Sequence, residues 1–177
     1  AVFDTETAKV TATIRTPGEP TGLALTGDGA MLYVTCGGPQ GKICVIDTRQ
    51  AKLLRTLPAG HTPNAPVLSP DGGFLYVCNR FDNKVSVINT RERKQVAEIP
   101  ALREPVAAAI TPDGKWLYVG NLLPHGPAVG AAPGGGPGQA RGPAPTVACN
   151  VSVIDAGKTA FDRDIALPNG STGLHGL

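Results

Sequence analysis

Residues 66–88 read PVLSPDGGFLYVCNRFDNKVSVI, and this stretch decides the fold. A short apolar run, Pro66 to Leu68, ends in a Ser-Pro-Asp-Gly turn, where Pro presets φ and Gly accepts a positive φ. The next run, residues 74–78, is rich in β-forming side chains. A polar loop then leads to Val85–Ile88, a third apolar run. The stretch therefore predicts three successive strands of alternating direction.

The same phrase recurs along the chain at a nearly constant interval. Tyr33, Tyr76 and Tyr118 are 43 and 42 residues apart, and the Asp-Gly pairs at 28–29, 71–72 and 113–114 keep similar steps. A fourth, more polar strand is predicted in each unit, at residues 95–99 in one and at 10–14 in another. A four-stranded antiparallel unit repeated about every 42 residues predicts an all-β protein made of β-propeller blades.

A single blade cannot bury both of its faces, so blades stack around a common axis. Counted from residue 1, the units span about 1–42, 43–84 and 85–150, followed by a partial unit at 151–177. We therefore expect one domain of about four blades or part-blades. A ring of six to eight blades needs roughly 250 to 340 residues. The chain also opens inside a repeat unit, so we expect a segment of a larger ring of the seven-bladed type; pairing with another chain is the alternative.

Composition narrows the class of partner. A net charge of +2 offers no electrostatic basis for binding nucleic acid, and no apolar run approaches the roughly 20 residues of a membrane span.

One insertion interrupts the period: residues 124–145 contain 13 Gly or Pro among 22 positions. Such a segment buries too little surface to offset its ordering entropy. We expect a mobile hairpin loop, with a lid or docking arm as the alternative.

Strand direction predicts which face of the blades carries function. The loops that differ between repeats all fall on one face, whereas the Asp-Gly turns repeat on the other. Candidate ligand- or partner-binding residues on the variable face are His61, Asn64, Asn79, Arg80, Arg103, Glu104, Asn121 and His175. His61 and Arg103 occupy equivalent positions and, with Glu104, could hold an anionic group or a metal. Solvated loop residues are the alternative. No catalytic residues and no metal site are predicted.

Four cysteines also fall on the variable face. Cys36 and Cys44 flank one hairpin loop, so a disulfide between them is the leading candidate. A Cys78–Cys149 bridge is a second candidate, and half-buried thiols are the default for the rest. An even number of cysteines permits an oxidising compartment without requiring one.

The repeats resemble the YVTN-type β-propeller family. Leu-Tyr-Val at 32–34, 75–77 and 117–119 matches its Tyr-Val-Thr-Asn motif, and Ser-Pro-Asp-Gly and Val-Ser-Val-Ile accompany it. Residues 103–109, 121–124 and 167–172 are most similar to the propellers associated with c-type cytochrome or di-haem peroxidase-like proteins. The resemblance implies an exported protein, periplasmic or extracellular. No Cys-x-x-Cys-His haem attachment sequence is present.

The sequence leaves three functions open. The first is a non-catalytic binding or assembly propeller that presents its loop-rich face to a protein partner or to further blades of the same ring. The second is a redox accessory propeller beside a c-type haem domain or with non-covalent haem, for which His61 and His175 are candidate ligands. The third is a lactonase-like hydrolase. The binding or assembly function is favoured because the motifs supply no nucleophile–base pair. This function requires no cofactor, so haem is expected only if the redox function holds.

Overall fold

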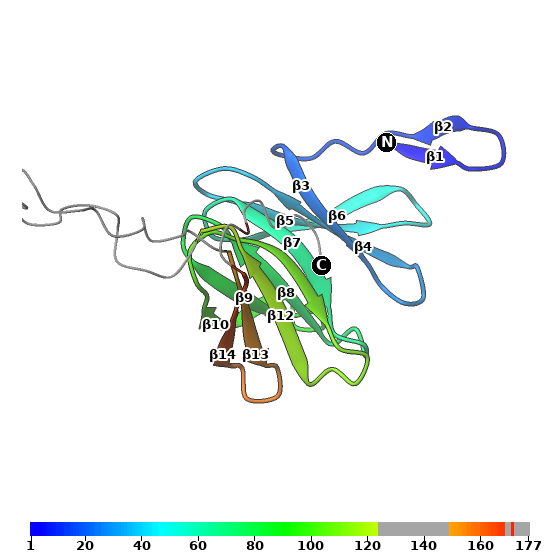
Figure 1. Ribbon diagram of the computed structural model, residues 1–177. Helices are drawn as coiled ribbons and strands as arrows, with labels where there is room; N and C mark the ends of the chain where they lie inside the picture. The colour runs from blue at the N-terminus through cyan, green and yellow to red at the C-terminus, as the bar shows by residue number, and fades with distance from the viewer. Residues whose placement is uncertain (124–148, 169–170, 172–177) are drawn as a thin grey trace, which may run out of the picture.

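The computed structural model describes residues 1–123, 149–168 and 171. These residues form fourteen β-strands and no helix (Figure 1). The strands make three four-stranded antiparallel sheets and one two-stranded hairpin, each sheet built in chain order. The hairpin pairs β1 (Val2–Asp4) with β2 (Lys9–Ala12) and projects beyond the first sheet (Figure 1). The all-β prediction and the four-stranded antiparallel unit are confirmed.

Each four-stranded sheet is one blade. The first blade contains β3 (Pro20–Leu25), β4 (Met31–Cys36), β5 (Lys42–Asp47) and β6 (Lys52–Pro58). The second blade contains β7 (Pro63–Leu68), β8 (Phe74–Asn79), β9 (Lys84–Asn89) and β10 (Lys94–Pro100). The third blade contains β11 (Pro105–Ile110), β12 (Trp116–Asn121), β13 (Asn150–Asp155) and β14 (Ala160–Ala166).

The blades stack as the repeat pattern requires. The first strand of each blade is innermost, since β3 contacts β7 and β7 contacts β11. Leu75, Val77 and Ile88 of the second blade pack against buried side chains of the first blade, among them Tyr33 and Ile43. The opposite side of the second blade packs on the third through a separate cluster of buried residues: Tyr76, Cys78, Val85, Val87, Ile99, Leu117, Val119, Ile154 and Ala156. The core therefore lies between blades, as expected for a sheet that cannot cover itself.

The blades are offset from the units counted from residue 1. Each blade begins at the strand that follows a Gly-Glu-Pro, His-Thr-Pro or Arg-Glu-Pro sequence, so the limits near 42 and 84 fall inside β5 and β9. The innermost strand of the second blade starts at Pro63 rather than at Pro66. The alternating strand expected at 10–14 is formed over residues 9–12. The whole insertion at 124–145 and the end of the partial unit lie outside the described residues.

The Asp-Gly turns are held by a repeated set of hydrogen bonds. The hydroxyls of Thr26, Ser69 and Thr111 donate to Asp28, Asp71 and Asp113 at 2.6, 2.5 and 2.5 Å. Each carboxylate also accepts a backbone N–H two residues further on. The Gly after each Asp takes a φ of 68° to 71°, which non-Gly side chains rarely adopt. These three turns define the turn face of the protein.

The turn carboxylates predict how stability changes in acid. Their hydroxyl and backbone donors hold the pKa of Asp28, Asp71 and Asp113 below the ordinary value of 3.8. The stabilisation is complete above pH 3.8 and is lost as pH falls through the lowered pKa. We expect the triple Asp→Asn variant to lose stability less steeply with falling pH than the parent, measured as denaturation midpoints from pH 6 to 2.5. Parallel curves for the two proteins would contradict this role.

No helix in residues 1–123 or 149–168 is long and apolar enough to cross a membrane.

Candidate binding face

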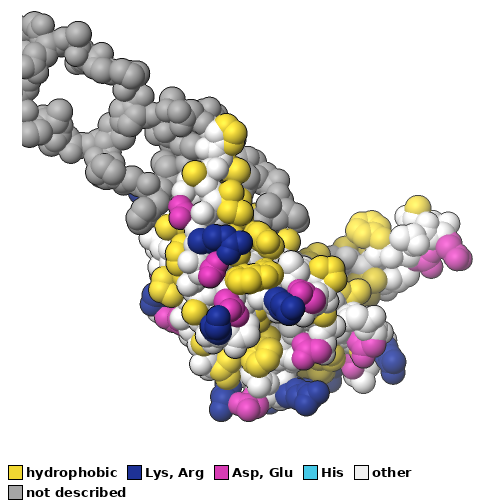
Figure 2. Space-filling model, turned by 60° about the horizontal axis from the view of Figure 1, so that its bottom comes forward, with side chains coloured by type: hydrophobic (Ala, Val, Ile, Leu, Met, Phe, Trp, Pro, Cys, Tyr) yellow, Lys and Arg dark blue, Asp and Glu magenta, His cyan; other side chains and the backbone are white. Residues whose placement is uncertain are grey.

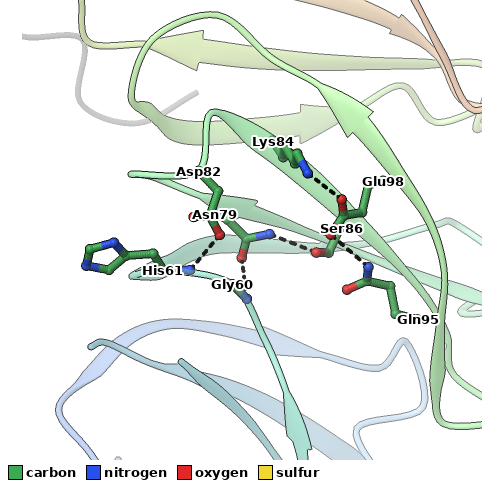
Figure 3. A network of polar contacts seen from close by, with 8 residues as sticks. All are labelled: Gly60, His61, Asn79, Asp82, Lys84, Ser86, Gln95 and Glu98. Carbon is green, nitrogen blue, oxygen red and sulfur yellow. Dashed lines mark hydrogen bonds and ion pairs between the residues drawn. The ribbon is translucent and has the colours of Figure 1, made fainter. Parts of the chain in front are cut away.

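The loop-rich face is organised around one buried amide. Asn79, at the end of β8, is 1% exposed. Its Nδ2 donates to Ser86 Oγ at 2.7 Å, and its Oδ1 accepts the backbone N–H of Gly60 at 3.1 Å (Figure 3). One side chain therefore ties the β8–β9 pair to the connection between β6 and β7, which carries His61.

The backbone around His61 is fixed from the same loop. Asp82 Oδ2 accepts the His61 N–H at 2.7 Å. The N–H groups of Arg80 and Phe81 donate back to the carbonyls of Thr62 and His61. The imidazole itself points away from this network (Figure 3). The backbone of His61 is thus held, and its partly exposed ring lies outside this hydrogen-bond network.

Four side chains form what we call the loop-face cluster: His61, Arg80, Phe81 and Glu104. The Phe81 ring, 47% exposed, lies between the other groups. Its centroid is 5.0 Å from that of the His61 ring and 4.9 Å from Arg80 Cζ, within the range of a cation–π contact. Arg80 also donates from Nη2 and Nε to Glu104 Oε2 at 2.7 and 3.0 Å. The cluster therefore joins the second blade to the entrance of the third.

Backbone strain occurs at Thr62, Asn83 and Glu104 on this face. Thr62 and Glu104 precede the innermost strands of the second and third blades at equivalent positions, with φ of 51° and 55°. A β-branched residue rarely adopts this left-handed conformation. Asn83 Oδ1 fixes the strained turn at Glu104 by accepting its N–H at 2.9 Å. Ala8, Ala51, Arg93 and Thr159 in other turns have similar φ values, so the strain does not by itself mark a functional site.

Asn121 is the counterpart of Asn79 in the third blade. Its Nδ2 donates to Ser152 Oγ at 2.9 Å, repeating the Asn79–Ser86 contact. Its buried Oδ1 has no partner among the described residues. The residue that corresponds to Gly60 is Leu102, and a Cβ at Gly60 would lie 2.6 Å from Asn79 Cγ. The backbone donor that serves Asn79 therefore cannot approach Asn121 in the same way.

The remaining predicted residues are more scattered. Asn64 lies away from the cluster, on the innermost strand β7, in a groove of about 250 Å³ shared with Thr21, Gly22 and Val106. Arg103 is exposed, and its carbonyl accepts the N–H of Leu123 at 3.2 Å. His175 lies outside the described residues. The structure thus brings together His61, Asn79, Arg80 and Glu104, with Asn121 in the adjacent blade.

All four cysteines are buried and carry free thiols. The Cys36 and Cys44 sulfurs are 3.7 Å apart, close but not bonded, so the disulfide stays a prediction. Burial raises the pKa of Cys44, and the contact with the Cys36 thiol adds to the shift. Burial alone raises the pKa of Cys78 to about 12. The Cys149 thiol donates to the carbonyl of Leu122 at 3.3 Å.

The turn face has a different character. In Figure 2, which turns the lower side of Figure 1 forward, acidic and basic side chains flank an apolar strip and no histidine is visible. A groove of about 480 Å³ runs between the second and third blades there, lined by apolar residues such as Phe74, Tyr76 and Val96. The combination of imidazole, guanidinium and aromatic ring belongs to the loop-rich face.

Sequence reasoning did not select Phe81, Gly60, Asp82 or Asn83 as site residues. Phe81 was detectable, because it is an aromatic residue inside a polar loop. The other three act through backbone contacts to residues about 20 positions away, and no local pattern marks them. In residues 1–123 and 149–168 no three His, Cys, Asp or Glu side chains gather as a metal site would require.

Comparison with known protein families identifies the chain. The model of the family described as "Cytochrome D1 heme domain" matches residues 28–132, more than half of the 177 residues. The chain belongs to the cytochrome D1 heme domain family. The match begins after β3 of the first blade and includes β4 to β12, together with every member of the loop-face cluster. No curated protein sequence matches this member of the family significantly.

Solved structures agree on the fold of this cytochrome D1 heme domain segment. Kuenenia stuttgartiensis hydrazine synthase superposes with a TM-score of 0.68 at 24% identity, covering 91% of this chain and 40% of that one. The dihydro-heme d1 dehydrogenase NirN, solved in complex with DHE, gives 0.57 at 21% identity, covering 80% of this chain and 25% of that one. The WD40 repeats of RRP9 give 0.63 at 11% identity, covering 85% and 39%.

These comparisons confirm a β-propeller of a family linked to cytochrome proteins. The chain spans about 40% of the length of the hydrazine synthase chain that it matches. The seven-bladed ring and the YVTN assignment stay predictions.

Proposed function

We propose that this propeller is a non-catalytic accessory module whose loop-rich face binds haem non-covalently, with His61 as the residue that would hold the iron. The observation that carries the proposal is the outward-pointing imidazole of His61, held by its backbone beside an exposed aromatic ring in a chain of the cytochrome D1 heme domain family. The redox alternative thereby moves ahead of the protein-binding one, since membership of this family supports it.

The donor set of the loop-rich face fits the chemistry of haem. Haem iron takes an imidazole nitrogen as an axial ligand, and the His61 ring lies outside the network that fixes its backbone. Propionates pair with guanidinium groups, and Arg80 and the exposed Arg103 lie on this face. The Phe81 ring offers an apolar surface for a porphyrin edge. Bound haem would supply one-electron chemistry, while the residues named here hold and orient it.

The proposal predicts haem binding that depends on one histidine. Hemin titrated into the purified protein is expected to develop a Soret band, and His61→Ala is expected to weaken binding at least tenfold because the axial ligand is lost. Arg80→Ala should weaken it several-fold, since a propionate partner disappears. His125→Ala, in the insertion, is the matched control and should leave both affinity and spectrum unchanged.

Two results would reject this proposal. Absence of a Soret band in the parent protein would remove haem as the ligand. A band that survives His61→Ala but disappears in His175→Ala would move the axial ligand off the loop-face cluster.

Docking of a protein partner on the same face is the second candidate. An exposed Phe beside an Arg is typical of an interface anchor, because both residue types are enriched at the centres of protein interfaces. Phe81→Asp should then abolish binding to a c-type cytochrome in a biosensor assay while leaving hemin binding of the His61 site measurable.

The lactonase alternative stays a prediction. Periplasmic or extracellular location remains part of the proposal, carried by the resemblance to exported propellers.

A further inference from the structure

The Cys36–Cys44 pair replaces a hydrogen bond that the other two blades keep. Asn79 on the second strand of its blade donates to Ser86 on the third, at 2.7 Å. Asn121 donates to Ser152 in the same way, at 2.9 Å. When the blades are aligned, the first blade has Cys36 at the Asn position and Cys44 at the Ser position.

Strand register shows that these positions are structurally equivalent. Cys36, Asn79 and Asn121 are paired across the ladder with Lys42, Lys84 and Asn150. In each blade the partner side chain, Cys44, Ser86 or Ser152, stands two residues after that paired residue. All three pairs therefore lie on the same diagonal between the second and third strands, and this diagonal brings the two side-chain ends into contact in every blade.

The first blade provides the surroundings in which a covalent bond could replace the polar one. Cys36 and Cys44 are 1% and 0% exposed, and they pack in one apolar cluster with Val34 and Ile46. A thiol–thiol hydrogen bond is weak, so the reduced pair holds the two strands less well than an amide–hydroxyl pair. Gly37 and Gly38 follow Cys36 directly, and Gly38 has a φ of 130°. The strand end next to Cys36 can therefore adjust as the sulfurs approach from 3.7 Å to a bonding distance.

We infer that Cys36 and Cys44 form a disulfide that covalently ties β4 to β5 at the position where the second and third blades use an Asn–Ser hydrogen bond. The oxidant is a small-molecule disulfide. One thiolate attacks it to form a mixed disulfide and releases one thiol; the second thiolate then displaces the other thiol. Two protein thiols lose two protons and two electrons in total, and the oxidant is reduced to two thiols. This inference does not depend on the proposed haem site.

Burial also predicts when the bond forms. Because burial raises the pKa of Cys44, the attacking thiolate is scarce in the folded reduced protein. Oxidation by oxidised glutathione is therefore expected to be at least tenfold slower for folded reduced protein than for protein in denaturant. We therefore expect the disulfide to form during folding in an oxidising compartment.

Peptide mapping tests the pairing directly. The protein is refolded in a glutathione redox buffer, alkylated without reduction and cleaved with trypsin. Cleavage after Arg15, Lys42 and Arg49 separates residues 16–42, which contain Cys36, from residues 43–49, which contain Cys44. We expect these two peptides to be joined by a bond that reductant breaks. Four alkylated cysteines, or a link to residues 56–80 or 142–158, which carry Cys78 and Cys149, would overturn the inference.

Two variants separate the disulfide from a merely structural role of the cysteines. Cys36→Asn with Cys44→Ser recreates the pair of the other blades, so it should fold with a Tm that reductant does not change. Reductant should lower the Tm of the parent protein by about 5 to 10 °C, the loss expected for a short disulfide loop in a domain of this size. An equal effect of reductant on both proteins would overturn the inference. Asn79→Cys with Ser86→Cys should add a second link, between residues 56–80 and 85–91.

Discussion

Leu75→Ala is expected to lower the free energy of unfolding by about 2–5 kcal/mol, the usual cost of deleting a fully buried leucine side chain. Leu75 is 0% exposed and packs from the second blade onto buried side chains of the first, Tyr33 and Ile43 among them. The substitution leaves a cavity between two sheets, neither of which can cover that surface alone. Chemical denaturation followed by fluorescence or circular dichroism measures the loss.

An exposed leucine of the first blade provides the control. Leu54, on β6, is 44% exposed, so Leu54→Ala should change the free energy of unfolding by no more than about 0.5 kcal/mol. Combining Leu75→Ala with Ile43→Ala should give a non-additive loss, because the two side chains share a cluster across the blade boundary. Combining it with Leu117→Ala should be additive, since Leu117 belongs to the other cluster. Equal losses for Leu75→Ala and Leu54→Ala would contradict the packing between blades.

Gly60→Ala is expected to cost about 1–3 kcal/mol of stability and to weaken hemin binding at the same time. A Cβ on Gly60 would lie 2.2 Å from Asp82 Oδ2 and 2.6 Å from Asn79 Cγ. Asp82 is exposed and can turn aside, but Asn79 is buried and fixed by Ser86. The connection must therefore move, and the bond from the Gly60 N–H to Asn79 and the position of His61 change with it. Thermal unfolding and hemin titration measure the two effects.

Gly27→Ala is the matched control for this substitution. Nothing lies within 4 Å of a Cβ placed on Gly27, so the added methyl group should be neutral in both assays. If Gly60→Ala lowered stability but left hemin affinity unchanged, the link between the Asn79 network and the His61 position would be wrong.

Repetition made most of the fold predictable. The Leu-Tyr-Val and Val-Ile-Asp sequences mark strands because β-forming residues cluster there, and the Asp-Gly turns mark their ends because Gly accepts a φ near 70°. The limits of each blade were less accurate. Each innermost strand begins with a Pro, which is more typical of a loop, and Asn64 and Ala65 lack the pattern of a strand. Asn64 pairs with Cys78 of the neighbouring β8, and Ala65 lies in the bulge between Asn64 and Val67.

The candidate site could be predicted only in part, for a related reason. Polar residues in variable loops pointed to His61, Arg80 and Glu104, and their role in binding stays a prediction. Local sequence does not encode the contact of the Phe81 ring with His61, about 20 positions earlier in the chain. The Arg80–Glu104 pair depends in addition on how the third blade packs against the second. Sequence also could not predict that Asn121 Oδ1 lacks a partner among the described residues. The cause is Leu102, which stands where the second blade has Gly60, and Gly60 matters only because its backbone comes close to the Asn79 amide.

What the sequence alone determined about this protein is its repeated sheet: the period, the strand order, the turn chemistry and the need of each blade for neighbours. All of these follow from interactions within about 42 residues, which side-chain alternation and turn residues specify directly. Tertiary structure decided which side chains meet. Three contacts depend on the distance and angle between adjacent strands and blades: His61 with Phe81, Arg80 with Glu104, and Cys36 with Cys44. Packing of many side chains together sets that geometry, and no single stretch of sequence contains it.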